Sequence, residues 1–378
     1  MADQYAHEAA PDERPALRAL RWEEPPDGPV VVLLDQTRLP AEEVELVCAD
    51  VPALVRAIQT LAVRGAPLLG ITGAYGVALA AVRGHDVAAA ALLLERSRPT
   101  AVNLALGVRL ALAAYRAAAE QGTEQAARAA LAAARELHRR DARASSRMAG
   151  HGLAFLDELF PGGGHRILTH CNTGALVSGG EGTAFAVALA AHRAGRLRGL
   201  WVDETRPLLQ GARLTAYEAA RNGMPYTLLT DNAAGSLFAA GEVDAVLIGA
   251  DRIAADGSVA NKVGSYPLAV LAKYHHVPFV VVAPTTTIDL DTLDGAAIVV
   301  EQRAEHEVTE VTAPRPSAGG GGAGVAVAPP GTRAYNPAFD VTPPELVTAI
   351  VTEEGTLSPV TGVGVAELCA RSRQVTIS

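Results

Sequence analysis

Cysteine is scarce in this sequence, and the few cysteines present are scattered. There are three, Cys48, Cys171 and Cys369, an odd number in which no pair has the close spacing of metal ligands. A disulfide framework is therefore not expected, and free thiols are typical of a reducing compartment. We predict a cytoplasmic protein without a metal site built on cysteines.

The sequence also has no excess of positive charge and no long apolar run. Its formal net charge is −9, whereas nucleic-acid binding depends on clustered lysine and arginine. The apolar stretches are interrupted by Arg or Asp well before the roughly twenty residues that a membrane-spanning helix needs. Residues 1–15 contain acids and prolines instead of the basic and apolar parts of a signal peptide. We expect no nucleic-acid partner and no membrane association, although a few local cations suffice to hold one phosphate.

What the chain does have is enough apolar sequence for a large core. Of its 378 residues, 49% are hydrophobic and 19% are charged, and this length favours two domains. We expect a disordered tail over residues 1–15, an N-terminal α+β domain over 16–160 and a Rossmann-like catalytic domain over 161–378. Pro161 and the glycines that follow it mark the boundary. Residues 313–330, rich in Gly, Ala and Pro, are predicted to form a flexible loop.

The two predicted domains differ in their secondary-structure patterns. In the first, apolar runs over residues 19–23, 30–34 and 44–48 predict strands, and 3.6-residue periodicity predicts helices from 52 to 159. In the second, short apolar runs alternate with helical segments, which is typical of a parallel sheet covered on both faces. Its strands are predicted over residues 166–170, 199–203, 226–229, 245–249 and 278–282, and its helices over 182–194, 212–222, 232–240 and 266–275. The predicted fold class is therefore α/β.

Polar residues follow four of the predicted parallel strands. Cys171 lies in the turn 169–174, Asp251 lies in 249–252, and charged or amide residues occupy 203–207 and 231–232. Ligands of such sheets bind beyond the carboxyl ends of the strands, so these residues predict a polar pocket at one edge. Taken singly, Cys171 also fits a small buried core residue, and Asp251 a structural ion pair. Their recurrence at four strand ends favours a functional site.

Three further motifs suit a phosphorylated ligand. Glycines in 179–183 open a predicted helix, where backbone N–H groups attract anions. Arg64 and Arg98 stand beside Gly and Pro ahead of predicted helices, and a guanidinium binds two phosphate oxygens at once. Asn261 and Lys262, after a predicted turn, suit hydroxyls and a phosphate. Taken alone, each arginine is better interpreted as an ordinary surface residue.

Together these segments resemble the methylthioribose-1-phosphate isomerases, which share a family with the regulatory subunits of initiation factor 2B and with ribose-1,5-bisphosphate isomerase. The resemblance runs from about residue 20 to residue 354 and is interrupted mainly at the glycine-rich stretch. Its motifs occur in order at residues 34–40, 64–67, 98–104, 170–174, 204–211, 249–254, 260–262 and 336–343. A chance resemblance would not reproduce so many motifs in the same order.

The resemblance implies an N-terminal domain with a small sheet and helices, a Rossmann-like second domain, and a homodimer. It implies an aldose–ketose isomerase that converts 5-methylthioribose 1-phosphate to 5-methylthioribulose 1-phosphate in methionine salvage, without a metal or other cofactor. Asp251 would be the proton donor and Cys171 its catalytic partner. The residues implied to bind the sugar phosphate are Arg64, Gly65, Ala66, Arg98, Gln210, Asn261 and Lys262.

Some positions depart from the family's usual pattern and keep alternatives open. Ala233 stands where a larger Met is usual, Glu181 where an aromatic is common, and Ser258 where an acid is common. A changed pocket wall would suit 5-deoxyribose 1-phosphate or a related 5-substituted ribose 1-phosphate. A non-catalytic regulatory subunit is a second alternative, against which the retained Cys171 and Asp251 count. A NAD-dependent dehydrogenase is disfavoured because no strand is followed by the dinucleotide glycine fingerprint.

The chemistry of the implied substrate sets the tasks of the reacting groups. Because the anomeric oxygen carries the phosphate, the ring does not open spontaneously, and a general acid must protonate the ring oxygen. A carboxylic acid at Asp251 performs this task if it stays protonated, which burial in an apolar-walled site favours. Hydrogen must then move from C2 to C1, through an enediol with Cys171 as base or as a hydride in a dry pocket. Phosphate held by Arg64, Arg98 and Lys262 would supply binding energy for positioning.

Overall fold

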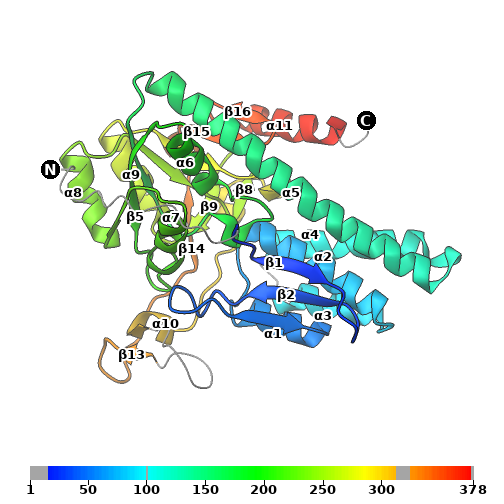
Figure 1. The fold of residues 1–378 in the computed structure, drawn as a ribbon. Helices are drawn as coiled ribbons and strands as arrows, with labels where there is room; N and C mark the ends of the chain where they lie inside the picture. Colours follow the sequence, from blue (N-terminus) through cyan, green and yellow to red (C-terminus); the bar gives the residue numbers. More distant parts are fainter. Residues whose placement is uncertain (1–15, 99–100, 312–323, 376–378) are drawn as a thin grey trace. The chain divides into compact units, whose positions relative to one another are not determined.

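The structure is a computed structural model in which the chain forms two compact units (Figure 1). The small-sheet unit comprises residues 16–143 and 175–181, and the parallel-sheet unit comprises residues 144–174 and those from 182 onward. The residues that the structure describes are 16–98, 101–311 and 324–375.

Two expectations fall wholly or partly outside these residues: the tail over 1–15, and residues 313–323 of the expected flexible loop. The domain boundary expected at residue 160 stays a prediction. No helix within the described ranges is long and apolar enough to cross a membrane.

The small-sheet unit begins with three antiparallel strands in the order β1-β2-β3. They are β1 (Leu20–Glu23), β2 (Val30–Leu34) and β3 (Glu45–Cys48), so the three predicted strands are confirmed. Every residue of the central strand β2 is buried, which explains its continuous apolar run.

The helices that follow are α1 (Val51–Gln59), α2 (Ala66–Val82), α3 (Val87–Ser97), α4 (Val102–Ala117) and α5 (Thr123–Leu159). The predicted helical region is thus confirmed.

Helices α2 and α4 pack unusually closely because small residues line their contact. A Cβ at Gly107 of α4 would lie 1.9 Å from the carbonyl oxygen of Gly70 in α2, so neither backbone leaves room for a side chain there. A Cβ at Gly70 would likewise lie 2.8 Å from the carbonyl oxygen of Asn103. Because Gly70 and Asn103 both stand near the start of their helices, the N-terminal ends of α2 and α4 lie beside each other.

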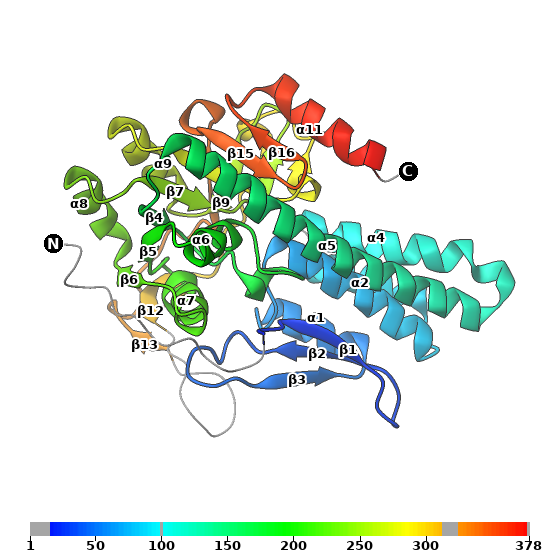
Figure 2. The same ribbon diagram turned by 45° about the horizontal axis from the view of Figure 1, so that its top comes forward.

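The parallel-sheet unit contains a seven-stranded sheet in the order β16-β15-β10-β7-β4-β5-β6 (Figures 1 and 2). All neighbouring strands are parallel except β15 and β16. The strands are β4 (His165–Thr169), β5 (Leu197–Asp203), β6 (Tyr226–Leu229), β7 (Ala245–Ile248), β10 (Phe279–Val282), β15 (Ala349–Thr352) and β16 (Gly355–Leu357). The five predicted strands are confirmed, and the parallel strands follow the order 3-2-1-4-5-6 of a doubly wound sheet. The predicted α/β class is therefore confirmed.

Two hydrophobic cores lie on opposite faces of this sheet because successive side chains of a strand point in opposite directions. In β7, Ala245 and Leu247 belong to one core, and Val246 and Ile248 belong to the other. The covering helices are α6 (Ala184–Arg193) and the second half of α5 on one face, and α8 (Ala234–Ala239), α9 (Ser265–Tyr274) and α11 (Gly362–Val375) on the other. Burial on both faces explains why these strands are apolar throughout.

A second, four-stranded sheet with the order β11-β8-β9-β14 was not predicted. Its strands are β8 (Arg252–Ala254), β9 (Val259–Lys262), β11 (Ile288–Asp289) and β14 (Phe339–Thr342). Prolines and Asn or Asp residues around β9 and β14 favoured turns in the sequence, but antiparallel pairing of Asn261 with Asp340 overrides that local preference. Asn261 and Lys262, expected to follow a turn, lie within strand β9.

The described end of the glycine-rich stretch contains a short strand, β13 (Val325–Ala326), which pairs antiparallel with β12 (Glu310–Val311). The flexible loop expected over residues 313–330 stays a prediction.

Candidate active site

The turn after β4 holds Cys171 in an unusual backbone conformation. Cys171 is 7% exposed and has φ +66°, a left-handed value that few non-glycine residues adopt. Its N–H donates to Thr205 Oγ1 (2.8 Å), and its carbonyl accepts from Thr215 Oγ1 (2.6 Å). Thr205, at the end of β5, is itself left-handed, with φ +64°. Two such residues joined by a hydrogen bond indicate a site whose geometry is imposed by its surroundings.

The rest of the Cys171 turn is anchored by buried polar groups. Asn172 Nδ2 donates to the carboxylate of Glu218 (2.7 Å), a residue that is almost fully buried. A Cβ at Gly174 would lie 2.3 Å from the same carboxylate, so only glycine fits there. Thr173 Oγ1 accepts from the backbone N–H of Phe185 (3.0 Å), which ties the turn to the start of α6.

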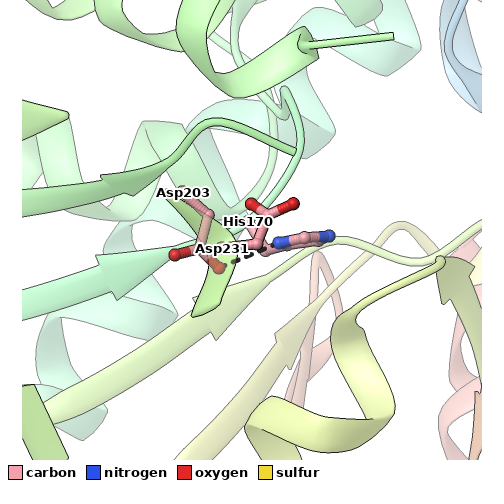
Figure 3. Close-up of side chains that lie close together, drawn as sticks. All are labelled: His170, Asp203 and Asp231. Atoms are coloured by element: carbon pink, nitrogen blue, oxygen red, sulfur yellow. Dashed lines mark hydrogen bonds and ion pairs between the residues drawn. The ribbon is translucent and has the colours of Figure 1, made fainter. Parts of the chain in front are cut away.

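His170, directly before Cys171, lies in a buried cluster of charged side chains (Figure 3). Its Nδ1 lies 3.0 Å from Asp203 Oδ2, and its Nε2 lies 2.9 Å from the carbonyl oxygen of Val263. Asp231 stands beside this pair and accepts from the backbone N–H groups of Thr205 and Arg206, each at 2.7 Å. Burial opposes a charged imidazole, but the hydrogen bond with Asp203 and the negative charges of Asp203 and Asp231 raise the pKa of His170.

The cluster also has the composition of a metal site. Ligand atoms of His170, Asp203 and Asp231 lie within 4.8 Å of one another. However, both ring nitrogens of His170 already have hydrogen-bond partners within the protein, although Asp203 Oδ1 has none among the described residues. A metal ion would have to displace some of these contacts, so the arrangement favours an ion pair.

Asp251 follows β7, the strand beside β4. The two strands are parallel, with Thr169 opposite Leu247, so Cys171 and Asp251 emerge from neighbouring strand ends. Asp251 is half-buried, and its N–H donates to the carbonyl of Ala260 in β9 (2.9 Å). This hydrogen bond places the Asp251 backbone next to the strand that carries Asn261 and Lys262.

Arg252, the cation nearest to Asp251 in the sequence, has a partner of its own. Its Nη1 lies 3.5 Å from a carboxylate oxygen of Asp289. Arg252 therefore forms an ion pair with Asp289.

Asn261 and Lys262 are buried polar residues of β9, 5% and 7% exposed. Asn261 Nδ2 donates to Ser265 Oγ (2.8 Å), and Lys262 Nζ donates to the carbonyl of Ala338 (2.7 Å). The ammonium also stands 5.2 Å from the ring centroid of Phe339, within cation–π range. Lysine is rarely buried to this extent, and such positions favour a functional role.

Gln210 presents a buried carbonyl oxygen to the interior of the same unit. The residue is 3% exposed, and Gln210 Oε1 has no hydrogen-bond partner in the described part of the chain. Gln210 precedes a π-helical turn over Gly211–Thr215, and turns of this type are frequent at functional sites. An unsatisfied buried acceptor is costly, and a ligand hydroxyl would satisfy it.

The remaining predicted site residues belong to the small-sheet unit. Arg64 is half-buried and precedes Gly65, which caps α2, and Ala66 is the first residue of that helix. Arg98, also half-buried, ends α3 shortly before the start of α4; Pro99 and Thr100 lie outside the described residues. Because the N-terminal ends of α2 and α4 lie together, two arginines flank two positive helix ends. This combination suits a phosphate.

Gly65 has a conformation and a neighbour that both require glycine. Its φ is +93°, and an added Cβ would lie 2.3 Å from Val177 Cβ. We expect Gly65→Ala to destabilise the fold by about 1–3 kcal/mol for the backbone, whose φ of 93° and ψ of 138° few other residues adopt, and by about a further 1–3 kcal/mol for the clash. Gly84→Ala is the matched control, because Gly84 has φ +71° but nothing within 4 Å of the added atom. Equal losses of unfolding free energy in urea would show that Val177 does not restrict this position.

The sequence drew attention to several of these residues without revealing their contacts. His170, Asp203 and Asp231 stood out as polar residues at strand ends, but their cluster did not. Thr215 and Glu218 were missed, because they lie in a segment with an ordinary helical pattern and no local motif marks them.

Fold and site together define an α/β protein whose polar residues gather at the carboxyl edge of a parallel sheet. The chain belongs to the initiation factor 2 subunit family, whose model matches residues 62–359. The family membership expected from the motifs is therefore confirmed.

Individual relatives are similar over nearly the whole chain. A methylthioribose-1-phosphate isomerase of Chloroflexus aurantiacus is 46% identical over 352 residues, which cover 91% of this chain and 96% of the relative. The crystal structure of 5-methylthioribose 1-phosphate isomerase from Pyrococcus horikoshii matches with a TM-score of 0.82 and 34% identity, covering 95% of this chain and 97% of that one. A translation initiation factor eIF-2B delta subunit from A. fulgidus matches with a TM-score of 0.77 and 37% identity, covering 94% and 100%.

Proposed function

We propose that this chain is an aldose–ketose isomerase that converts 5-methylthioribose 1-phosphate to 5-methylthioribulose 1-phosphate in methionine salvage. The observation that carries the proposal is that Cys171 and Asp251 follow two neighbouring parallel strands, β4 and β7. Relatives with 46% identity over 91% of the chain bear the name of this enzyme, which supports the same substrate. The protein acts in the cytoplasm as a homodimer on a small sugar phosphate, without a nucleic-acid, membrane or metal partner.

Asp251 is the general acid in this mechanism. It gives its proton to the ring oxygen, which becomes the C4 hydroxyl as the bond from that oxygen to C1 breaks. The electron-deficient C1, still bonded to the phosphate oxygen, then receives hydrogen from C2. The C2 hydroxyl loses its proton, and C2 becomes the ketone carbon.

Cys171 is the catalytic group that removes a proton at C2 or from its hydroxyl. As a base it takes the C2 hydrogen as a proton, and the resulting enediol is protonated at C1. In a dry pocket the hydrogen moves directly as a hydride, and Cys171 assists the loss of the hydroxyl proton. Deuterium from D₂O appears at C1 of the product in the first route and is absent in the second.

Groups remote from the reacting carbons bind the substrate. Arg64, Arg98 and Lys262, with the backbone at Gly65 and Ala66, hold the phosphate, and Gln210 and Asn261 bind sugar hydroxyls. The binding energy of the phosphate holds C1 and C2 in the reacting position. It offsets the translational and rotational entropy that the substrate loses in reaching the transition state.

The substrate preference is tested by comparing kcat/KM for the two sugar phosphates. A methylthio group in an apolar pocket is worth roughly 1–3 kcal/mol, so we expect 5-methylthioribose 1-phosphate to exceed 5-deoxyribose 1-phosphate by roughly 10–200-fold. The reverse preference would assign the same mechanism to the 5-deoxy substrate, the alternative that the departures at Ala233 and Glu181 keep open. Turnover of neither would support the non-catalytic regulatory alternative.

A further inference from the structure

We propose that His170 and Asp203 form a positioning pair for the catalytic site. The His170 ring, held between Asp203 and the carbonyl of Val263, fixes the Cys171 turn relative to the strand that carries Asn261 and Lys262. This inference rests on the proposed function, because the pair acts through residues assigned there.

Three segments of the site meet on the His170 ring. The first is the Cys171 turn, which begins at the next residue. The second is the end of β5, where the Asp203 carbonyl accepts from Thr205 Oγ1 (3.1 Å), the same oxygen that accepts the N–H of Cys171. Asp203 is therefore connected to Cys171 by two routes: through the imidazole of His170, the preceding residue, and through the hydroxyl of Thr205.

The third segment is the turn between β9 and α9. Val263, whose carbonyl lies 2.9 Å from His170 Nε2, directly follows Lys262. A Cβ at Gly264 would lie 2.6 Å from His170 Cε1, so the ring packs directly against this turn. Asp340 holds the same turn from β14 by accepting from the N–H groups of Gly264 (2.7 Å) and Tyr266 (3.1 Å).

The hydrogen-bond pattern is compatible with an ionic pair. The carbonyl of Val263 can only accept, so Nε2 of His170 carries a proton. Burial raises the pKa of Asp203, and the hydrogen bond with His170 opposes that rise; we assign the second ring proton to Nδ1, which faces an ionised Asp203. Three carboxyl groups surround the ring: Asp203 on β5, Asp231 after β6 and Asp340 on β14. Burial lowers the pKa of His170, but the hydrogen bond with Asp203 and the negative charges around the ring outweigh it, so the net direction is upward and the charged ring is favoured relative to a free imidazole.

A buried ion pair is a poor means of stabilising a core, because removing two charges from water costs about as much as their attraction returns. Its use here follows from geometry. A doubly protonated ring connects two acceptors in fixed directions, which an apolar side chain cannot do.

The most informative variant is Asp203→Asn, which removes the charge and preserves the shape. The new amide donates to Nδ1 of a neutral His170, whose Nε2–H still donates to Val263. At pH 7.5 we expect the ¹⁵N NMR signal of His170 to change from that of a doubly protonated ring to that of a neutral one. We also expect kcat to fall roughly 10–100-fold and the alkaline limb of the kcat profile to move to lower pH, in line with the loss of a charged hydrogen bond.

His170→Asn provides a second test if the first variant does not fold. Its short amide still reaches Asp203 but not Val263, so we expect a roughly tenfold or greater rise in KM as well as a lower kcat. Asp244→Asn is the matched control. Asp244 pairs with Arg166 (2.6 Å) at the opposite ends of the strands, so its loss should reduce stability without moving kcat, KM or the pH profile.

The outcomes separate the pair from the proposed function. Kinetics and pH profile unchanged in folded Asp203→Asn, or a neutral His170 ring in the wild type at pH 7, would overturn the pair while leaving the isomerase intact. Loss of turnover on EDTA treatment and its return with Zn²⁺ would overturn the ion pair in favour of a metal at the same cluster. No turnover by the wild type would refute the function, while the NMR signature of His170 remains an independent test.

Discussion

Cys171→Ser is expected to lower the turnover of 5-methylthioribose 1-phosphate by roughly a thousandfold, within the range of a lost general base. Serine fits the buried turn, and the two backbone hydrogen bonds of Cys171, to Thr205 and from Thr215, do not involve its side chain. The loss therefore reflects the weaker acidity of a hydroxyl and not a disturbed backbone. Single-turnover kinetics measure the chemical step, and calorimetry with the substrate should show a dissociation constant changed less than about threefold.

Cys48→Ser is the control for this variant. Cys48 ends β3 in the other unit, and burial raises the pKa of its thiol to about 11, so it is an inert core cysteine. Its replacement should cost stability but leave turnover per folded molecule unchanged. A Cys171→Ser enzyme that keeps a tenth or more of wild-type turnover would refute the role of this thiol.

Asp251→Asn is the second substitution with a large expected effect. An amide has nearly the same shape as the carboxyl group but cannot give a proton to the ring oxygen, so we expect turnover to fall by roughly 10²–10⁴-fold. The backbone hydrogen bond from Asp251 to Ala260 remains, and with it the position of β9. Substrate affinity should therefore stay close to that of the wild type, as measured by calorimetry.

Asp289→Asn separates this chemical role from a structural one. Asp289 pairs with Arg252, the residue after Asp251, and the pair is about a quarter exposed, so its loss should change stability by less than about 1 kcal/mol. Turnover should be retained. An equal loss of activity in both variants would show that Asp251 matters through the local structure and not as an acid.

The central part of the fold could be predicted because its signal is local. β7 and β10 are buried along their whole length, so each gives an uninterrupted apolar run between helical segments. The second sheet gave no such signal. β9 contains Asn261 and Lys262, and its pairing with β14 joins residues about eighty positions apart, a contact that no local pattern encodes.

The candidate site could be predicted to the same extent and for the same reason. The rule that ligands bind beyond parallel strand ends drew attention to the turns that contain Cys171 and Asp251, and the family resemblance then implied their catalytic roles. The contacts of His170 could not be found this way, because one partner, Asp203, is 33 residues distant and the other is the backbone carbonyl of Val263. Every residue type has a backbone carbonyl group, so the identity of residue 263 does not reveal that its carbonyl accepts a hydrogen bond.

The most direct test of the isomerase assignment is ¹³C and ³¹P NMR of 5-methylthioribose 1-phosphate, labelled at C2, with the EDTA-treated full-length protein. We predict that the C2 signal moves to the region of a ketone while the phosphorus stays bonded as a phosphate ester, and that Cys171→Ser and Asp251→Asn each slow this conversion by roughly 10²–10⁴-fold. An unchanged C2 signal with folded wild-type protein, or conversion at the wild-type rate by both variants, would contradict the account.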